Sequence, residues 1–488
     1  MNMFIKVMAS LVMLVGGLTN LASAEENRTR PNVLFIAVDD LRPELGCYGA
    51  AAKTPNIDRL AASGLRFDRA YCNQAVCGAS RVSLMTGLYP EFTGERTYHV
   101  TDWRKRWADV VTLNQHFKAN GYTTIGMGKI YHGSGGPGVD PENWTEWVMV
   151  GGKEYNDPAS LKNMRDRNGR RRGPSTEAHT AGDEAHADGN RAKVGAARLR
   201  QLAKEERPFF LAVGFTKPHL PFNAPQKYWD LYKRDDFHLP ENLKVPPGYP
   251  DYARNTQAGE LRSYSDVPLK GSPAEFPDEL NRRLLHGYHA CVSYTDRNIG
   301  VLLDALEKSG AAQNTIVVLW ADHGWKLGDH QSWCKHTNFE CDTRVPLIIR
   351  HPGKNSPRGS TTALVELIDL YPTLCDMCDL EKPTHLQGKS FAGTFEGTSL
   401  PPPRETAYSS YPHGRGQGKS VIGHSIRTSQ YRYTQWWDKQ TDKPVATILT
   451  DIEADPGETT SIAGREELKA QLSAQLRERV LAARKNTQ

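Results

Sequence analysis

The chain has 488 residues, of which 38% are hydrophobic, and this composition can bury a large core spread over about two or three domains. Its formal net charge is +5, and it falls to +4 without the first 24 residues, which contain one Lys and no acid. A charge this balanced does not by itself indicate a polyanion-binding protein, and nucleic acid is not an expected partner of a chain that is exported, as its first 24 residues predict.

The first 24 residues have the pattern of a secretory signal. Lys6 precedes an apolar stretch at 7–18, and Ala22-Ser23-Ala24 is a suitable cleavage site before Glu25. The alternative is a membrane anchor, but one Ser and two Gly interrupt the stretch, which is shorter than the roughly 20 residues of a spanning helix. We therefore expect an exported protein, periplasmic or secreted, with no membrane span after cleavage of segment 1–24.

Four apolar runs predict buried strands, and each leads into polar residues. The runs and the residues that follow them are 33–38 with Asp39-Asp40, 123–127 with Gly128-Lys129, 209–215 with Lys217-Pro218-His219, and 316–321 with Asp322-His323-Gly324. Apolar runs without alternation indicate strands covered on both faces, as in a mostly parallel sheet flanked by helices. Because ligands bind beyond the carboxyl ends of such strands, the polar residues predict an active site there.

Other segments predict how the rest of the α/β domain is organised. Apolar residues at helical spacing over 292–306 stop at Gly310, just before the strand at 316–321, and form a helix-then-strand unit. The apolar stretch 364–380 predicts another helix. The polar segments 129–209 and 239–277 are expected to be long insertions that frame the site.

The eight cysteines show no framework spacing of a disulfide-rich protein. Cys375 and Cys378 resemble a metal or redox motif, but no second Cys or His pair follows at zinc spacing, so two buried thiols or a local bridge are expected. Cys334 and Cys341 could also pair, and the sequence leaves this open.

A Pro- and Gly-rich passage at 383–404 separates the main body from a last segment. We predict a catalytic domain over 25–395 and a smaller C-terminal α+β subdomain over 396–488. Alternating aromatic and polar residues over 425–437 indicate antiparallel strands, and 466–483 has the pattern of a terminal helix.

Asp39, Asp40 and Asp322 would concentrate negative charge at one point, and such a cluster needs a cation. Carboxylate oxygens suit calcium or magnesium, whereas zinc would gather more His or Cys ligands. Calcium is the expected ion. Asp39 and Asp40 alone could instead begin a turn and cap a helix, but the addition of Asp322-His323 favours the metal site.

The string Cys77-Gly78-Ala79-Ser80-Arg81 is the most specific motif. If a helix begins at Cys77, then Cys77 and Arg81 lie on one face, and the helix terminus favours an anion. A Cys at a helix start is by itself more often a packed thiol, and a thiolate nucleophile would need a paired base.

This string resembles the Cys-x-Pro-Ser-Arg signature of the type I, formylglycine-dependent sulfatase family. The sequence looks most like the iduronate-2-sulfatase branch, and the resemblance covers most of the chain after segment 1–24. The other matching motifs are Arg30-Pro31-Asn32-Val33, Gly46-Cys47-Tyr48-Gly49, Lys217-Pro218-His219, Asp322-His323-Gly324-Trp325 with Lys335, and Ser425-Ile426-Arg427-Thr428.

The resemblance implies an alkaline phosphatase-like α/β fold, with a mostly parallel sheet flanked by helices, and hydrolysis of sulfate monoesters. It implies that a formylglycine-generating enzyme converts Cys77 to formylglycine, whose hydrated aldehyde is the nucleophile. One calcium ion would be held by Asp39, Asp40, Cys77, Asp322 and His323.

The same resemblance suggests catalytic roles. Arg81 and Lys129 would stabilise the modified residue and its charge. Lys335 and His219 would meet the leaving oxygen, with His219 as general acid or hydrogen-bond donor. His132 would take the proton of the second hydroxyl so that aldehyde and sulfate are released. Each of Lys129, His132, His219 and Lys335 could otherwise be an ordinary loop or surface residue, and their shared placement beyond the sheet, together with the match to the family, favours catalysis.

One position departs from the family pattern, because Ala79 stands where Pro is usual; we still expect modification of Cys77. The predicted substrate is a sulfated oligo- or polysaccharide, specifically a 2-sulfated uronic acid at a chain end. Two alternatives stay open. One is a phosphate or phosphonate ester hydrolase, which would favour two transition metals and a Thr or Ser nucleophile, and the other is an inactive carbohydrate-binding relative.

Overall fold

The computed structural model describes residues 30–100, 102–133, 137–167, 170–353, 356–395, 404–413 and 420–485. The predicted signal segment 1–24 lies outside these residues, and so does the stretch 396–403 that follows the predicted domain boundary. Both remain predictions. Within the described ranges, no helix is long and apolar enough to cross a membrane.

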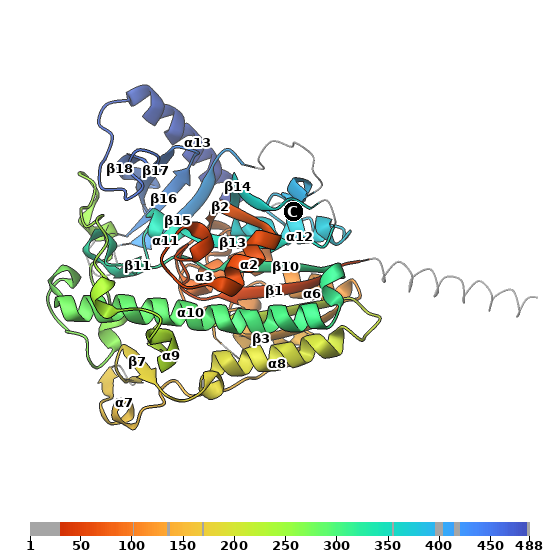
Figure 1. Ribbon diagram of the computed structural model, residues 1–488. Helices are drawn as coiled ribbons and strands as arrows, with labels where there is room; N and C mark the ends of the chain where they lie inside the picture. The colour runs from red at the N-terminus through yellow and green to blue at the C-terminus, as the bar shows by residue number, and fades with distance from the viewer. Residues whose placement is uncertain are drawn as a thin grey trace, which may run out of the picture.

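An eight-stranded sheet forms the centre of the protein (Figure 1). Its strands, in spatial order, are β14 (Gly359–Glu366), β2 (Leu65–Tyr71), β13 (Arg344–Arg350), β10 (Thr315–Ala321), β1 (Asn32–Val38), β8 (Phe209–Phe215), β3 (Thr123–Gly128) and β4 (Glu146–Val148). All neighbours are parallel except the two pairs that β13 makes with β10 and β2. The expected mostly parallel sheet is therefore confirmed, and the four predicted strands are β1, β3, β8 and β10.

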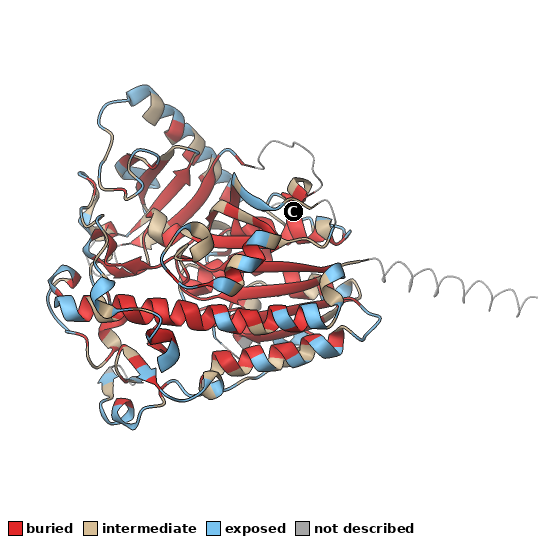
Figure 2. Cartoon of the chain, in the orientation of Figure 1, coloured by how far each residue is buried: buried red, intermediate tan, exposed pale blue. Residues whose placement is uncertain are grey.

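Helices cover both faces of this sheet. Val213 of β8 lies against Gly195 of α8 (Ala187–Leu202), whereas Phe210 of the same strand packs on Phe117 of α6 (Leu113–Ala119) with ring centroids 4.8 Å apart. Because side chains alternate along a strand, these contacts place α8 and α6 on opposite faces. The sheet between them is buried along its strands, as Figure 2 shows.

The remaining helices complete the two layers. The 31-residue α10 (Asp278–Lys308) packs on α8 and α2, and α3 packs on α6 and α12. The predicted helix at 292–306 is the second half of α10. The other α-helices are α2 (Pro55–Ser63), α3 (Cys77–Thr86), α4 (Pro90–Thr93), α5 (Trp103–Arg106), α7 (Pro158–Lys162), α9 (Gln226–Trp229), α11 (Glu340–Thr343), α12 (Leu370–Met377) and α13 (Glu466–Arg484).

The strand register brings the predicted polar residues to one edge. Val38 pairs with Ala321 of β10 and with Phe215 of β8, and Gly128 of β3 pairs with Gly214 of β8. The residues that follow these strands therefore lie at the same edge of the sheet. Gly128 has a left-handed backbone (φ 72°), and a Cβ there would lie 2.1 Å from the Gly214 carbonyl oxygen, so this close turn requires glycine.

The two insertions differ in content. Segment 129–209 contains β4, α7, β5 (Arg165–Arg167), β6 (Arg170–Arg172), β7 (Thr176–His179) and α8. Segment 239–277 has no α-helix or strand and is built from short 3-10 turns. Three further short strands, β9 (Phe222–Pro225), β11 (Lys326–Leu327) and β12 (Trp333–Cys334), lie outside these insertions.

The predicted helix over 364–380 is wrong in its first part. Leu364 and Val365 pair with Arg69 and Ala70 of β2, so the sheet edge takes up this segment as the end of β14 before α12 begins. All eight cysteines are free thiols, with Cys375 and Cys378 buried. The pairing of Cys334 with Cys341, which the sequence leaves open, is not present.

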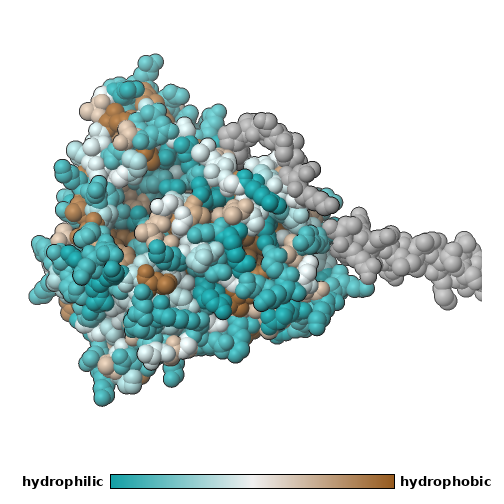
Figure 3. Space-filling view, in the orientation of Figure 1, coloured by the Kyte–Doolittle hydropathy of each residue, from teal (hydrophilic) through white to brown (hydrophobic). Residues whose placement is uncertain are grey.

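A separate antiparallel sheet forms the C-terminal part, with strands in the order β15 (Ala407–His413), β16 (Val421–Arg427), β17 (Tyr431–Asp438) and β18 (Lys443–Asp451). Leu472, Leu476 and Val480 of α13 are buried in a hydrophobic cluster with residues of this sheet. The antiparallel strands and the terminal helix expected from the sequence are thus confirmed. The face seen in Figure 3 is mostly hydrophilic, with small separate hydrophobic areas.

Candidate active site

Three carboxylates meet at the carboxyl edge of the central sheet. Asp39 and Asp40 follow β1, Asp322 follows β10, and all three residues are completely buried. One oxygen of each lies within 4.8 Å of the others, and the backbone N–H of Asp40 donates to Asp322 Oδ1 at 3.2 Å. The structure therefore brings together the acids that the sequence places about 280 residues apart.

Cys77 begins α3, as predicted, and its side chain faces this cluster. Its Sγ lies 3.2 Å from His323 Nε2 and 4.0 Å from Lys129 Nζ. Burial, and after it the charge of Asp39, raises the pKa of the Cys77 thiol well above its usual value. An unmodified Cys77 is therefore a neutral thiol at pH 7, which argues against a plain thiolate nucleophile.

Arg81 holds the carboxylates in place. Its Nε donates to Asp322 Oδ2 at 2.9 Å and its Nη2 donates to Asp39 Oδ1 at 3.1 Å, while Nη1 donates to the carbonyls of Lys129 and, at 3.2 Å, Ile130. All three guanidinium nitrogens are thus engaged by the protein. Because the side chain is completely buried, this network fixes the relative positions of the two acids.

Lys129 and His132 come from the turn after β3. Lys129 Nζ donates to Asp39 Oδ2. Burial alone would raise the pKa of Asp39, but the charges of Lys129, His219 and Arg81 outweigh it and lower that pKa well below its usual value. His132 makes no hydrogen bond through its buried Nδ1 to any described residue, and burial together with the charge of Lys129 lowers its pKa to about 3.

His219 and Lys335 also lie near the acids and share a partner, Glu260. His219 Nε2 is 2.8 Å from Glu260 Oε1, and Lys335 Nζ is 3.1 Å from Glu260 Oε2. Lys335 Nζ also donates to Asp40 Oδ1 at 2.8 Å. His219 Nε2 is 3.9 Å from Asp40 Oδ2 and 4.0 Å from Asp39 Oδ2, so His219 and Lys335 line the same site as Cys77 and Lys129.

Sequence reasoning missed Glu260. It is a single acid in the polar segment 239–277, where no periodicity or motif distinguishes it from a solvated side chain. Burial would raise the pKa of Glu260, but the charges of Lys335 and His219 lower it well below its usual value, so it is a carboxylate at neutral pH. The only indication in the sequence was the expected position of this insertion beside the site.

The donor set fits a divalent cation. The permanently charged side chains of the site are four carboxylates and three cations. The four carboxylates are those of Asp39, Asp40, Asp322 and Glu260, and the three permanent cations are Arg81, Lys129 and Lys335. A divalent cation would offset the negative charge of the carboxylates, so that the site could attract a sulfate ester, which carries one negative charge. The mainly oxygen donors suit a hard ion such as calcium.

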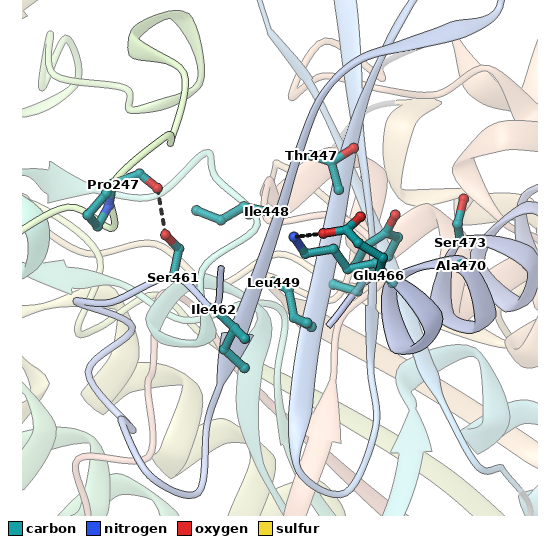
Figure 4. A pocket seen from close by; sticks show the side chains of 11 residues that line it. Pro247, Thr447, Ile448, Leu449, Ser461, Ile462, Glu466, Ala470 and Ser473 are labelled. Atoms are coloured by element: carbon teal, nitrogen blue, oxygen red, sulfur yellow. Dashed lines mark hydrogen bonds and ion pairs between the residues drawn. The ribbon is translucent and has the colours of Figure 1, made fainter. Parts of the chain in front are cut away.

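A cavity of about 240 Å³ opens beside the site. Val76 and His336, the chain neighbours of Cys77 and Lys335, are part of its wall, and so are Tyr98, Tyr252 and Tyr411. Tyr411 comes from β15, so the C-terminal sheet contributes to the wall of this cavity. Another cavity, of about 530 Å³, lies between β18 and α13 (Figure 4). It contains none of the candidate catalytic residues.

Comparisons with known proteins agree with this arrangement. Residues 31–380 match the family model of Sulfatase, and residues 328–486 match that of the C-terminal region of N-sulphoglucosamine sulphohydrolase. The chain is 33% identical to human iduronate 2-sulfatase over 87% of its length and 88% of that protein. It is 32% identical to a sulfatase of Formosa agariphila over 91% of its length and 85% of that protein.

Solved structures show the same fold. A phosphonate monoester hydrolase of Agrobacterium radiobacter aligns with a TM-score of 0.72 and 22% identity over 92% of this chain and 96% of that one. A protein solved with its substrate D-glucosamine-2-N,6-O-disulfate aligns with a TM-score of 0.71 and 22% identity over 93% of this chain and 98% of that one. These likenesses confirm the predicted alkaline phosphatase-like architecture, while the sequence matches show more: the chain belongs to the sulfatase family and is a sulfuric ester hydrolase.

Proposed function

We propose that this sulfatase removes the sulfate group from a 2-sulfated uronic acid at the end of a sulfated saccharide, using a formylglycine made from Cys77 and one calcium ion. The observation that carries the proposal is the position of Cys77. Its Sγ lies 3.2 Å from His323 Nε2, beside the buried Asp39, Asp40 and Asp322 cluster. The 33% identity to human iduronate 2-sulfatase over most of both chains supports the choice of substrate class.

The proposed calcium ligands are Asp39, Asp40, Asp322, His323 and residue 77. When bound, calcium would lower the cost of ionising the gem-diol of formylglycine and would polarise the sulfate. Arg81 would hold two of the proposed calcium ligands in position, because its guanidinium donates to Asp39 and Asp322 through separate nitrogens. Its contacts favour positioning of the ligands over direct contact with substrate.

Lys129 and His132 would act on the nucleophile side. Lys129 Nζ is 4.0 Å from Cys77 Sγ, close enough to stabilise negative charge that develops on an oxygen at residue 77. His132 is neutral at pH 7 because its pKa is lowered to about 3, so its imidazole can accept a proton from a hydroxyl of residue 77.

Lys335 and His219 would act on the leaving oxygen. Burial alone would lower the pKa of Lys335, but the charges of Asp40 and Glu260 outweigh it and raise that pKa well above its usual value. Lys335 therefore serves as a permanent cation and hydrogen-bond donor. His219 Nε2 lies 2.8 Å from Glu260 Oε1 and Nδ1 lies 2.6 Å from the Leu220 carbonyl oxygen, and these two contacts would orient the imidazole beside the leaving group.

The cavity beside the site supports a saccharide substrate. Its tyrosines offer flat apolar surface for a sugar ring, and Arg96 and Asn255 offer polar contacts at its edge. Tyr98 is 43% exposed, so its ring is available to a bound molecule. Within the proposal, the terminal residue occupies the catalytic site and the next sugar occupies this cavity.

The test combines mass spectrometry with a sulfate-release assay. Peptide mass spectrometry of protein expressed with a formylglycine-generating enzyme should show conversion of Cys77, even though Ala79 replaces the usual Pro. The converted, calcium-loaded enzyme should release inorganic sulfate from oligosaccharides that end in a 2-sulfated uronic acid, and it should not act on oligosaccharides sulfated only at other positions. Unmodified Cys77 in fully active protein would disprove the mechanism.

The two alternative functions are distinguished by the same preparation. A phosphate or phosphonate ester hydrolase would turn over those esters faster than sulfate esters in parallel assays. An inactive carbohydrate-binding relative would bind sulfated saccharides, measured by calorimetry, without releasing sulfate after full conversion of Cys77. Export to the periplasm or medium, with cleavage before Glu25, is tested by N-terminal sequencing of the mature protein.

A further inference from the structure

A second cluster of metal-ligating side chains lies outside the active site, between β7 and the start of α8 (lower part of Figure 1). It consists of Glu177, His179 and His186, which are 5%, 7% and 3% exposed. One ligand atom of each lies within 4.8 Å of the others. The residues form the pattern Glu-x-His-x6-His, and no role in sulfate hydrolysis accounts for them.

The two imidazoles point their Nε2 atoms at each other, 2.6 Å apart. His186 Nδ1 lies 2.7 Å from the carbonyl oxygen of Lys153, which can only accept, so Nδ1 carries the proton and Nε2 presents a lone pair. Metal-bound histidines have this arrangement, in which the distal N–H donates to a backbone carbonyl and fixes the tautomer. His179 Nδ1 is buried and has no hydrogen-bond partner among the described residues.

The third residue completes a mixed nitrogen and oxygen donor set. Glu177 accepts from the backbone N–H groups of Asn156 at 2.7 Å and Asp157 at 3.1 Å. These bonds hold the carboxylate in place and use only part of its accepting capacity, because a carboxylate has about four lone-pair positions.

We propose that Glu177, His179 and His186 bind a zinc ion that is separate from the catalytic cation. Two imidazole nitrogens and one carboxylate are a zinc donor set, and a water molecule would fill the fourth position. Calcium is a poor competitor here because it prefers six to eight oxygen ligands. The two cation sites therefore differ in chemistry, with mainly oxygen donors at Asp39, Asp40 and Asp322 and mainly nitrogen donors here.

The position of this site suggests what zinc would stabilise. α8 begins at Ala187, directly after His186, and Asp188 in its first turn accepts from the backbone N–H groups of Thr216 at 2.9 Å and Lys217 at 2.7 Å. The start of α8 therefore holds the loop that leads to His219. Zinc would link β7 to this helix start and so stabilise the base of the catalytic loop.

The experiment uses the full-length mature protein, stripped of metal and kept in excess calcium so that the catalytic site is saturated. Zinc chloride is then titrated, and bound zinc is measured by calorimetry and elemental analysis. We expect one zinc per chain and a rise in the midpoint of thermal unfolding. Cobalt(II) in place of zinc should give visible d–d absorption bands typical of a four-coordinate site with nitrogen ligands.

Matched variants locate the ion. His179→Gln and His186→Gln should each weaken zinc binding about a hundredfold or more, since even outer-shell partners of a metal are worth about 10- to 100-fold. His286→Gln, at a buried histidine on α10 outside the cluster, should bind zinc normally, and so should Asp322→Asn. Absence of zinc binding by the calcium-saturated wild-type protein, or binding unchanged in both cluster variants, overturns the proposal and leaves an ordinary hydrogen bond between two neutral histidines. The cobalt spectrum of the wild-type protein decides the matter even if a variant does not fold.

Discussion

Glu340 joins the catalytic part of the protein to the C-terminal sheet, and its replacement by glutamine tests how much folding free energy its charge contributes. The side chain lies on α11 and is 14% exposed. Its Oε2 is 3.4 Å from Arg427 Nε of β16 and also accepts from Arg432 of β17, while Tyr71 donates to Oε1 at 2.8 Å. Glu340→Gln preserves the shape of the side chain and removes the charge that both arginines use.

The pKa of Glu340 sets the expected magnitude. Burial by itself would raise this pKa, but the charges of Arg427 and Arg432 outweigh it and lower the value from 4.5 to about 2. At about 1.4 kcal/mol per pH unit, this difference corresponds to about 3 kcal/mol of folding free energy at pH 7. Because the folded-state pKa is the lower one, the stabilisation is complete above pH 4.5 and disappears as the pH falls through 2. At pH 3 about 1 kcal/mol should remain.

Urea unfolding of the wild type and of the variant, followed by tryptophan fluorescence at pH 7 and pH 3, measures both values. The matched control is Glu453→Gln, because Glu453 also reaches across to the catalytic part but is 57% exposed and lies 3.6 Å from Arg69. An exposed pair of this kind is worth less than about 1 kcal/mol. If Glu340→Gln costs no more than the control at pH 7, or if its cost does not shrink at pH 3, the electrostatic explanation is refuted.

Three further predictions concern the active site. Asp322→Asn removes a carboxylate that serves both Arg81 and the proposed ion, so kcat/KM should fall about a hundredfold or more and calcium binding, measured by calorimetry, should weaken. Glu260→Gln removes the negative charge between His219 and Lys335, so kcat for sulfate release should fall about tenfold or more. Tyr411→Ala should raise KM for a sulfated oligosaccharide several-fold and leave kcat/KM for a small aryl sulfate unchanged, because only the larger substrate reaches the cavity.

Each of these predictions has an outcome that contradicts it. Undiminished calcium affinity of the Asp322→Asn protein would place the ion elsewhere. Wild-type kcat in the Glu260→Gln protein would mean that the carboxylate does not orient the neighbouring groups. Equal losses on large and small substrates would show that Tyr411 acts on the reaction centre and does not line a separate sugar subsite.

Much of the fold and of the candidate site could be predicted from local patterns. A strand covered on both faces must be apolar along its length, so β1, β3, β8 and β10 are visible as uninterrupted runs. Polar residues directly after such strands must lie at their ends, and Asp39, Lys129 and Asp322 are found there. The residue types and spacing of the motif that begins at Cys77 resemble the signature of one family, the sulfatases.

Other features depend on contacts between segments that carry no local pattern. Glu260 is one acid in a polar insertion, and only the folded chain places it between His219 and Lys335. The edge of the sheet, through pairing with β2, decides that Leu364 and Val365 are strand and not helix. The wall that Tyr411 contributes to the cavity depends on how the C-terminal sheet docks. Sequence by itself thus determined the buried strands and the residues at their ends, because burial requires a local run of hydrophobic residues. Tertiary structure decided which distant residues contact one another, because a contact between residues far apart in the chain requires no local sequence pattern.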